Sequence, residues 1–178
     1  MARIKDLMDI FLQPGELFVA DANFQIRTIL GSCVSITLWH PRLRIGCMSH
    51  FLLPTRSSFT VGAALDGRYG DEALQLMFQD LKAAGVQPAQ CEAKIFGGCN
   101  MFPGKKYHLW GQQATGLTVG KRNGEAAHAL LHQNDIAVVA ENLYGNGYRQ
   151  VIFDVSNGDV WSKQVRPAHP EYSAETAT

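Results

Sequence analysis

Strand-like segments follow one another in runs along this chain, and that order constrains the fold more than any other feature. Residues 16–20 and 24–30 read as strands, a hairpin spans 33–53, and two further strands at 150–155 and 160–165 flank the turn Asn157-Gly158. Strict alternation of strands with helices would indicate a doubly wound parallel sheet. The runs instead predict an α+β fold: a single-domain sandwich of mostly antiparallel β-sheet with two or three flanking helices.

Helical spacing of apolar residues identifies the flanking helices. Residues 71–84 give the clearest pattern, with Leu74, Met77, Phe78 and Leu81 on one face and Gly85 at the end. A second helix is expected to begin at Asn123 as its N-cap. The apolar positions within 4–12 predict a third, short helix that ends before Pro14-Gly15.

Length, charge and cysteine usage limit the kind of protein. The 178 residues, 46% of them hydrophobic, fit one domain. We expect a helical extension over 1–12, the main domain over 13–165 and a loose tail over 166–178. A formal net charge of zero argues against nucleic acid as a partner, and no apolar run approaches the roughly 18 residues of a membrane span.

Four irregularly spaced cysteines do not resemble a disulfide framework. Free thiols in a reducing compartment are therefore expected, and with them a cytoplasmic protein that does not insert into a membrane. One thiol can then be reactive while the others fill the core.

The hairpin over 33–53 brings one of these thiols close to a histidine. If His40–Leu43 is the loop and Trp39 pairs with Arg44, then Cys33 lies directly opposite His50. Directly opposed residues have Cβ atoms roughly 4.5–5.5 Å apart on one face of a sheet. A thiol and an imidazole at that distance can form a nucleophile–base pair, whereas a slip of one residue would separate them onto opposite faces.

Two other interpretations of these residues stay open. Taken alone, Cys33 can be an inert, buried thiol. Cys47 and His50 have C-x-x-H spacing and Cys33 could join them around a metal, but three ligands without a second paired motif are a weak metal signal. We therefore expect neither a metal nor another cofactor.

Several motifs together resemble the CheD family, the chemoreceptor glutamine deamidases of bacterial chemotaxis. The resemblance covers roughly residues 13–165. It rests on Leu30-Gly31-Ser32-Cys33-Val34, on the run from Gly46 to Pro54, on Tyr69–Gly85, on Lys94–Phe102, on Gly120–Asn123 and on Val151–Asp154.

The resemblance implies a Cys-His catalytic pair, which falls on Cys33 and His50, and a threonine a few residues before the cysteine. Thr28 is the nearest threonine, one position from the strict slot, which Arg27 occupies. The implied enzyme is a cysteine-dependent protein-glutamine glutaminase, a hydrolase that converts glutamines of methyl-accepting chemotaxis receptors to glutamates. A CheC-type chemotaxis phosphatase is a further implied partner.

The pair would act through a thioester. A neighbouring imidazolium is expected to lower the pKa of the Cys33 thiol, the thiolate attacks the carboxamide, ammonia leaves, and water hydrolyses the thioester. Backbone N–H groups around Gly31 and Ser32 are the expected donors to the oxyanion. Two alternatives remain: a non-catalytic adaptor that binds chemoreceptors or a chemotaxis phosphatase, and a small cysteine protease.

Overall fold

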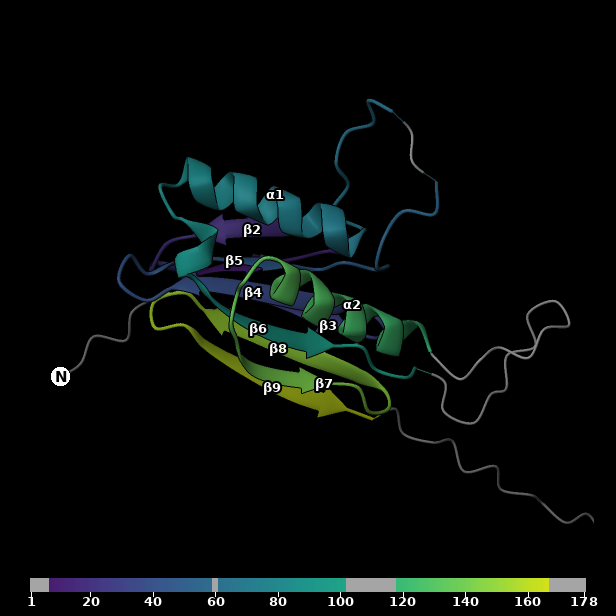
Figure 1. The fold of residues 1–178 in the computed structure, drawn as a ribbon. Helices are drawn as coiled ribbons and strands as arrows, with labels where there is room; N and C mark the ends of the chain where they lie inside the picture. The colour runs from purple at the N-terminus through teal and green to yellow at the C-terminus, as the bar shows by residue number, and fades with distance from the viewer. Residues whose placement is uncertain (1–6, 59–60, 102–117, 167–178) are drawn as a thin grey trace, which may run out of the picture.

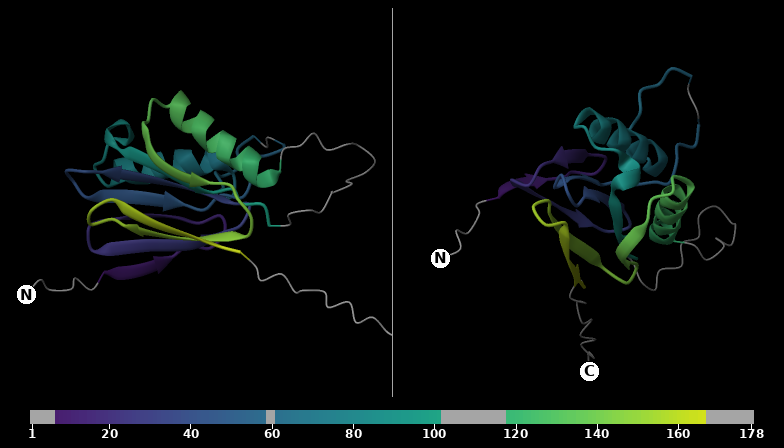
Figure 2. Two further views of the ribbon diagram at one scale, coloured as in Figure 1. Left: turned by 90° about the horizontal axis from the view of Figure 1, so that it is seen from below. Right: turned by 60° about the vertical axis from the view of Figure 1, so that its left-hand side comes forward.

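The fold consists of two stacked β-sheets with a layer of helices on one side. It is seen in a computed structural model that describes residues 7–58, 61–101 and 118–166. Figure 1 shows α1 and α2 side by side over one sheet, and the second sheet lies on the far side of the first. The view from below in Figure 2 separates the three layers.

The described part of the chain contains nine strands, two α-helices and one 3-10 turn. The strands are β1 (Met8–Phe11), β2 (Leu17–Ala20), β3 (Phe24–Leu30), β4 (Val34–His40), β5 (Ile45–Ser49), β6 (Glu92–Gly97), β7 (Val138–Leu143), β8 (Tyr148–Asp154) and β9 (Asp159–Val165). The helices are α1 (Gly70–Ala83) and α2 (Val119–Gln133), and the 3-10 turn is η1 (Pro88–Gln90).

One sheet has the strand order β1-β3-β8-β9 and the other β2-β5-β4-β6-β7. Five of the seven pairings between neighbouring strands are antiparallel, and only β1–β3 and β6–β7 are parallel. The predicted α+β sandwich of mostly antiparallel sheet is therefore confirmed.

The five-stranded sheet is the central layer of the fold. It is apolar on both faces, because the helices cover one face and the four-stranded sheet covers the other. Val34, Ile36 and Leu38 of β4 point toward the helices. Met48 of β5 and Phe96 of β6 point toward the other sheet, where they meet residues of β3 and β8 such as Ile26 and Phe153. Side chains alternate between the faces of a strand, so residue parity in β4 and β5 decides which layer each side chain enters.

The two helices differ in how well their ends were predicted. Helix α1 matches the predicted 71–84 closely. Helix α2 begins at Val119, and Thr118 is its N-cap, whose hydroxyl accepts from the Lys121 N–H at 3.3 Å. The prediction that Asn123 caps this helix is therefore wrong: Asn123 lies in the second turn and is fully buried.

The N-terminal helix predicted over 4–12 is also wrong where the structure describes it. Met8–Phe11 is strand β1, which pairs in parallel with the first half of β3, and Leu12 is buried between the sheets. A short apolar run fits either period, and the open edge of β3 offers backbone partners that an isolated two-turn helix lacks. Residues 1–6, and the predicted tail from residue 167 onward, lie outside the described residues.

Neither helix seen in the described ranges combines the length and apolar character that crossing a membrane requires.

Candidate active site

A three-residue turn, Gly31-Ser32-Cys33, connects β3 of one sheet to β4 of the other. The Cys33 side chain packs against the core between the sheets and is only half-buried. The other three cysteines are buried and no cysteine is in a disulfide. Cys33 is therefore the thiol that an external reagent or substrate can reach.

The hairpin that carries Cys33 and His50 has a different register from the predicted one. Trp39 pairs with Gly46, not with Arg44, and the loop is 41–44 rather than 40–43. His40 stays in the strand as the partner of Ile45. Arg44 closes the loop with a left-handed φ of 52° and an N–H bond to the His40 carbonyl at 2.9 Å.

This shift moves the pairing by two residues, so each side chain keeps its face of the sheet. The Val34–Phe51 bridge extends the observed register, with backbone bonds of 3.1 and 3.0 Å in the two directions. Cys33 and His50 are therefore diagonal neighbours rather than directly opposed. Diagonal neighbours have Cα atoms about 7–8 Å apart, within reach of long or aromatic side chains.

His50 points from the central sheet toward β3, where it meets Thr28. The Thr28 Oγ1 lies 2.8 Å from His50 Nδ1, and the two side chains are 2% and 3% exposed. Alternation along β3 explains why Thr28 makes this contact. Arg27 points to the outside, where it forms an ion pair with Asp9 at 2.7 Å.

The hydrogen bonds fix the tautomer of His50. The Thr28 hydroxyl donates its only proton to the carbonyl of Leu12 at 2.8 Å. It must then accept from His50, so Nδ1 carries the hydrogen and Nε2 holds the lone pair. Nε2 is buried and has no partner among the described residues. An imidazole in this tautomer can act as a general base through Nε2.

Burial keeps the pair electrically neutral. It lowers the pKa of His50 to about 4, against smaller upward effects of the Leu12 carbonyl and Glu16. Burial also raises the pKa of the Cys33 thiol, with a smaller opposing effect of its own backbone N–H. The expected imidazolium that lowers the thiol pKa is therefore absent from the free protein near pH 7. The geometry fits a thiol that loses its proton to a neutral imidazole during attack.

Three consecutive carbonyls of the turn Gly31-Ser32-Cys33, called the Cys33 turn below, are held from outside it. The Gly31 carbonyl accepts from the Cys99 N–H and the Cys33 carbonyl from the Gly98 N–H, both at 2.8 Å. The Ser32 carbonyl accepts from Asn123 Nδ2 at 2.9 Å. In a trans peptide the N–H points away from the C=O, so these bonds also direct the N–H groups of Ser32 and Cys33. Neither N–H has an acceptor among the described backbone groups.

The turn after β6 can approach so closely because two of its residues are glycines. Gly97 and Gly98 have φ of 111° and 64°, and a Cβ at Gly97 would overlap the carbonyl oxygen of Cys33. A Cβ at Gly98 would press on the backbone of Gly120 in α2. The Gly97-Gly98 pair thus packs directly against the Cys33 turn.

Arg149 fastens this glycine turn from β8. Arg149 is 2% exposed, and its guanidinium donates to the carbonyls of Gly97 at 3.0 Å and Tyr144 at 3.1 Å. No carboxylate pairs with it within the described ranges, and its Nε has no partner there. Nη1 also donates to Cys99 Sγ at 3.6 Å, so the buried cation is held by two carbonyls and a thiol. A buried charge is costly unless it is hydrogen-bonded, so these bonds hold the guanidinium against the glycine turn.

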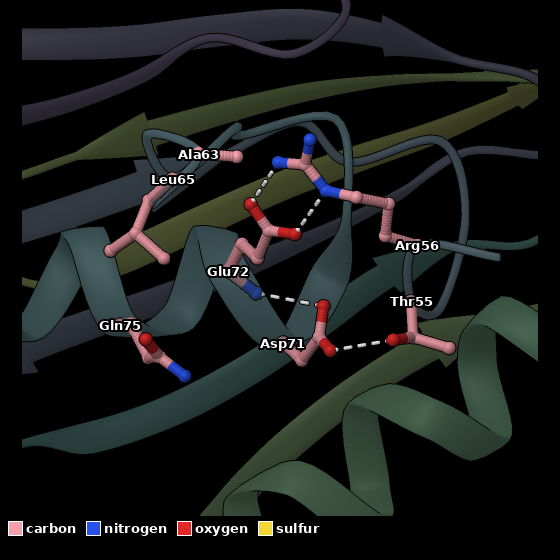
Figure 3. A pocket seen from close by; sticks show the side chains of 7 residues that line it. All are labelled: Thr55, Arg56, Ala63, Leu65, Asp71, Glu72 and Gln75. Carbon is pink, nitrogen blue, oxygen red and sulfur yellow. Dashed lines mark hydrogen bonds and ion pairs between the residues drawn. The ribbon is translucent and has the colours of Figure 1, made fainter. Parts of the chain in front are cut away.

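A second polar region lies apart from Cys33 and His50, at the start of α1. A cavity of about 260 Å³ opens there (Figure 3). Its lining residues are Thr55, Arg56, Ala63, Leu65, Asp71, Glu72 and Gln75.

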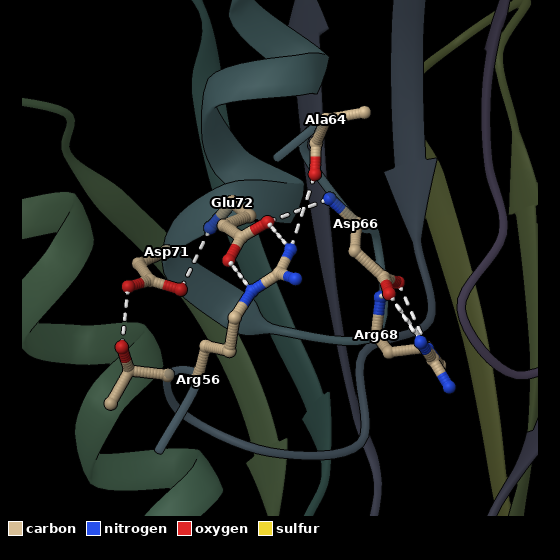
Figure 4. A network of polar contacts seen from close by, with 7 residues as sticks. Arg56, Ala64, Asp66, Arg68, Asp71 and Glu72 are labelled. Atoms are coloured by element: carbon tan, nitrogen blue, oxygen red, sulfur yellow. Dashed lines mark hydrogen bonds and ion pairs between the residues drawn. The ribbon is translucent and has the colours of Figure 1, made fainter. Parts of the chain in front are cut away.

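The charges of this region pair with one another (Figure 4). Arg56 binds Glu72 through two bonds of 2.8 and 2.6 Å, and Arg68 binds Asp66. The Arg56–Glu72 contact fastens the segment before α1 to the helix, and we assign no site to this region.

Cys47 does not join His50 and Cys33 around a metal. It points into the core on the helix side of the central sheet, whereas His50 and Cys33 point to the other side. In the part of the chain that the structure describes, no three His, Cys, Asp or Glu side chains gather in a way that could hold a metal ion.

Sequence reasoning missed three contributors to this site: the Leu12 carbonyl, Asn123 and Arg149. For Asn123 a signal exists, since it shares its helix face with Ala127 and Leu131 at intervals of four. A polar residue on an apolar face needs a buried partner. For Leu12 and Arg149 the partners lie on distant strands, and no local pattern points to them.

The fold and these side chains define a class of protein: a two-sheet α+β domain with a partly exposed thiol and a buried, oriented imidazole where the sheets meet. Comparison with known families narrows this class. The family model described as "CheD chemotactic sensory transduction" matches residues 52–164, and this chain belongs to the CheD family.

Relatives match over nearly the whole chain. "Probable chemoreceptor glutamine deamidase CheD 2" of Albidiferax ferrireducens is 60% identical over 94% of this chain and 93% of its own length. CheD 3 of Dechloromonas aromatica, described in the same words, is 44% identical over 92% and 96%. CheD 1 of Chromobacterium violaceum is 39% identical over 95% and 84%.

Proposed function

We propose that this protein is a cysteine-dependent chemoreceptor glutamine deamidase. It hydrolyses the side-chain amide of selected receptor glutamines to glutamate and releases ammonia. The observation that supports this most is the hydrogen-bonded chain from Leu12 through Thr28 to His50, which leaves Nε2 as a base between the same two sheets as the Cys33 thiol. The names of the relatives supply the substrate.

The proposed first half-reaction forms a thioester. His50 Nε2 takes the thiol proton as Cys33 Sγ attacks the amide carbon, and the carbonyl oxygen becomes an oxyanion. The N–H groups of Ser32 and Cys33 are the proposed donors to that oxyanion. The intermediate collapses, the carbon–nitrogen bond breaks, and His50 returns the proton to the leaving ammonia.

The second half-reaction uses the same imidazole. Water enters, His50 removes its proton, and the hydroxide attacks the thioester carbon. The carbon–sulfur bond breaks, Cys33 recovers its proton, and a glutamate side chain leaves. Thr28 contributes by holding Nδ1, so that the ring keeps the tautomer with a basic Nε2 in both halves.

A mass measurement tests this function. Incubation with the cytoplasmic fragment of a chemoreceptor should add about 1 Da per converted glutamine and release one ammonia for each. Cys33→Ala should abolish both, whereas Cys47→Ala, which changes a thiol on the other side of the central sheet, should not. Receptor binding without any mass change would favour the adaptor, and cleaved peptide bonds would favour the protease.

The partners follow from the same proposal. Methyl-accepting chemotaxis receptors are the proposed substrates, and their modified segments place the reaction in the cytoplasm. A CheC-type chemotaxis phosphatase is the second proposed partner, as the family resemblance implies. Co-elution of that phosphatase with Cys33→Ala protein would support it, and separate elution at micromolar concentrations would contradict it.

A further inference from the structure

Among the described residues, Asn123 makes the contact with the Cys33 turn that spans the most residues along the chain. It lies on the buried face of α2, and its side chain is fully buried. Nδ2 donates one proton to the Ser32 carbonyl at 2.9 Å and the other to the Leu52 carbonyl at 2.7 Å. The first acceptor precedes Cys33, and the second lies two residues after His50.

The orientation of this amide is forced. Both neighbours are carbonyl oxygens, which only accept, so the NH2 group must face them. Oδ1 points the other way and has no partner among the described residues. A buried acceptor left without a partner is costly, so the two bonds on the Nδ2 side hold the side chain in place.

We propose that Asn123 is a positioning residue that aims the Cys33 N–H at the oxyanion. The Ser32 C=O and the Cys33 N–H belong to one peptide plane, so a donor that fixes the carbonyl also fixes the direction of the N–H. The second bond ties this plane to the segment directly after β5 that carries His50 and Leu52. One amide thereby sets the orientation of the oxyanion donor relative to the base.

This inference rests on the proposed function, but its chemistry can be separated from that of the thiol. Attack on an amide needs the oxyanion donor, whereas alkylation of Cys33 by iodoacetamide is a displacement at carbon that forms no oxyanion. A change confined to the direction of the Cys33 N–H must therefore slow deamidation and leave alkylation alone.

The test compares Asn123→Asp and Asn123→Ala with Leu131→Ala. The Asp variant keeps the shape and leaves at most one donated proton in place of two, and Leu131→Ala opens the same helix face two turns away. Displacing a preorganised group by about 1 Å can cost 10²-fold. We expect kcat to fall about 100-fold in both Asn123 variants, with KM and the alkylation rate of Cys33 within about twofold of wild type. Leu131→Ala should keep its kcat at a temperature where it is folded.

Three results would overturn the inference. They are wild-type kcat in Asn123→Asp, an alkylation rate that falls in step with kcat, and an equal loss of kcat in Leu131→Ala. If the Ala variant does not fold, Asn123→Asp and Asn123→Ser carry the comparison.

The wild-type protein gives a reading that needs no variant and no receptor. Both side-chain amide protons of Asn123 should exchange slowly with solvent, and free exchange of either would contradict the proposed contact.

If wild-type protein converts no receptor glutamine, the proposed function fails. The NMR shift of the Cys33 amide then decides the present inference: a change in Asn123→Asp but not in Leu131→Ala supports it, and no change refutes it.

Discussion

The buried imidazole of His50 makes the stability of this protein depend on pH in a predictable direction. In the unfolded chain His50 has its ordinary pKa of 6.5, and in the fold burial lowers that pKa to about 4. Between these values the unfolded state binds a proton that the folded state does not. Stability is therefore full above pH 6.5 and falls as the pH drops toward 4.

The size of the effect follows from the two pKa values. Each unit of difference is worth about 1.4 kcal/mol, so the loss from pH 7 amounts to about 2 kcal/mol at pH 5 and about 3 kcal/mol at pH 4. Because the side chain is only 3% exposed, solvent screening does not reduce this figure greatly.

The assay is urea denaturation at several pH values, with His50→Gln as the reference. The variant has no titrating group at this position, while all carboxylates stay the same. Subtracting its pH dependence isolates the contribution of His50. Wild type should lose about 3 kcal/mol more than the variant between pH 7 and pH 4. Parallel curves for the two proteins would refute the burial of a neutral imidazole.

The remaining predictions concern the residues around this imidazole. Thr28→Val should lower kcat by about 10- to 100-fold because Nδ1 loses its acceptor, and Thr28→Ser should restore most of it; equal kcat in both variants would remove the hydroxyl from the mechanism. Gly97→Ala should lower the free energy of unfolding in urea by more than about 1 kcal/mol, since a left-handed φ and the Cys33 carbonyl both oppose a Cβ. Iodoacetamide at pH 7 should label Cys33 before the three buried thiols, as peptide mapping would show; labelling of all four at one rate would contradict the difference in exposure.

Local patterns predicted most of the regular elements. The strand expected over 24–30 is β3 with the same bounds, and the helix expected over 71–84 is α1, shifted by one residue. Both have an unambiguous period and glycine, proline or polar residues at their ends. The first ten residues have no such clarity, because a run that short fits a helix as well as an edge strand.

The features of the candidate site also divide into those that the sequence could predict and those that it could not. Cys33 and His50 could be placed on one face from sequence, because a wrong loop boundary changed the register by two and preserved parity. The burial that keeps both groups neutral could not be foreseen, since it depends on a second sheet packed against the first. Thr28 stood one position from the family pattern, and the inward face of β3 explains its contact with His50.

By itself, the sequence determined the class of fold, the thiol and imidazole on one face of a hairpin, and the family to which they belong. These depend on periodicity and on residues close together along the chain. Only the tertiary structure decided the tautomer of His50, the neutral state of the pair and the fixed direction of the peptide planes around Cys33. Each of these depends on the Leu12 carbonyl, Thr28, Asn123 or Arg149. Each of the four groups contacts a residue 16 to 91 positions away in the chain, and those contacts form only when the layers pack.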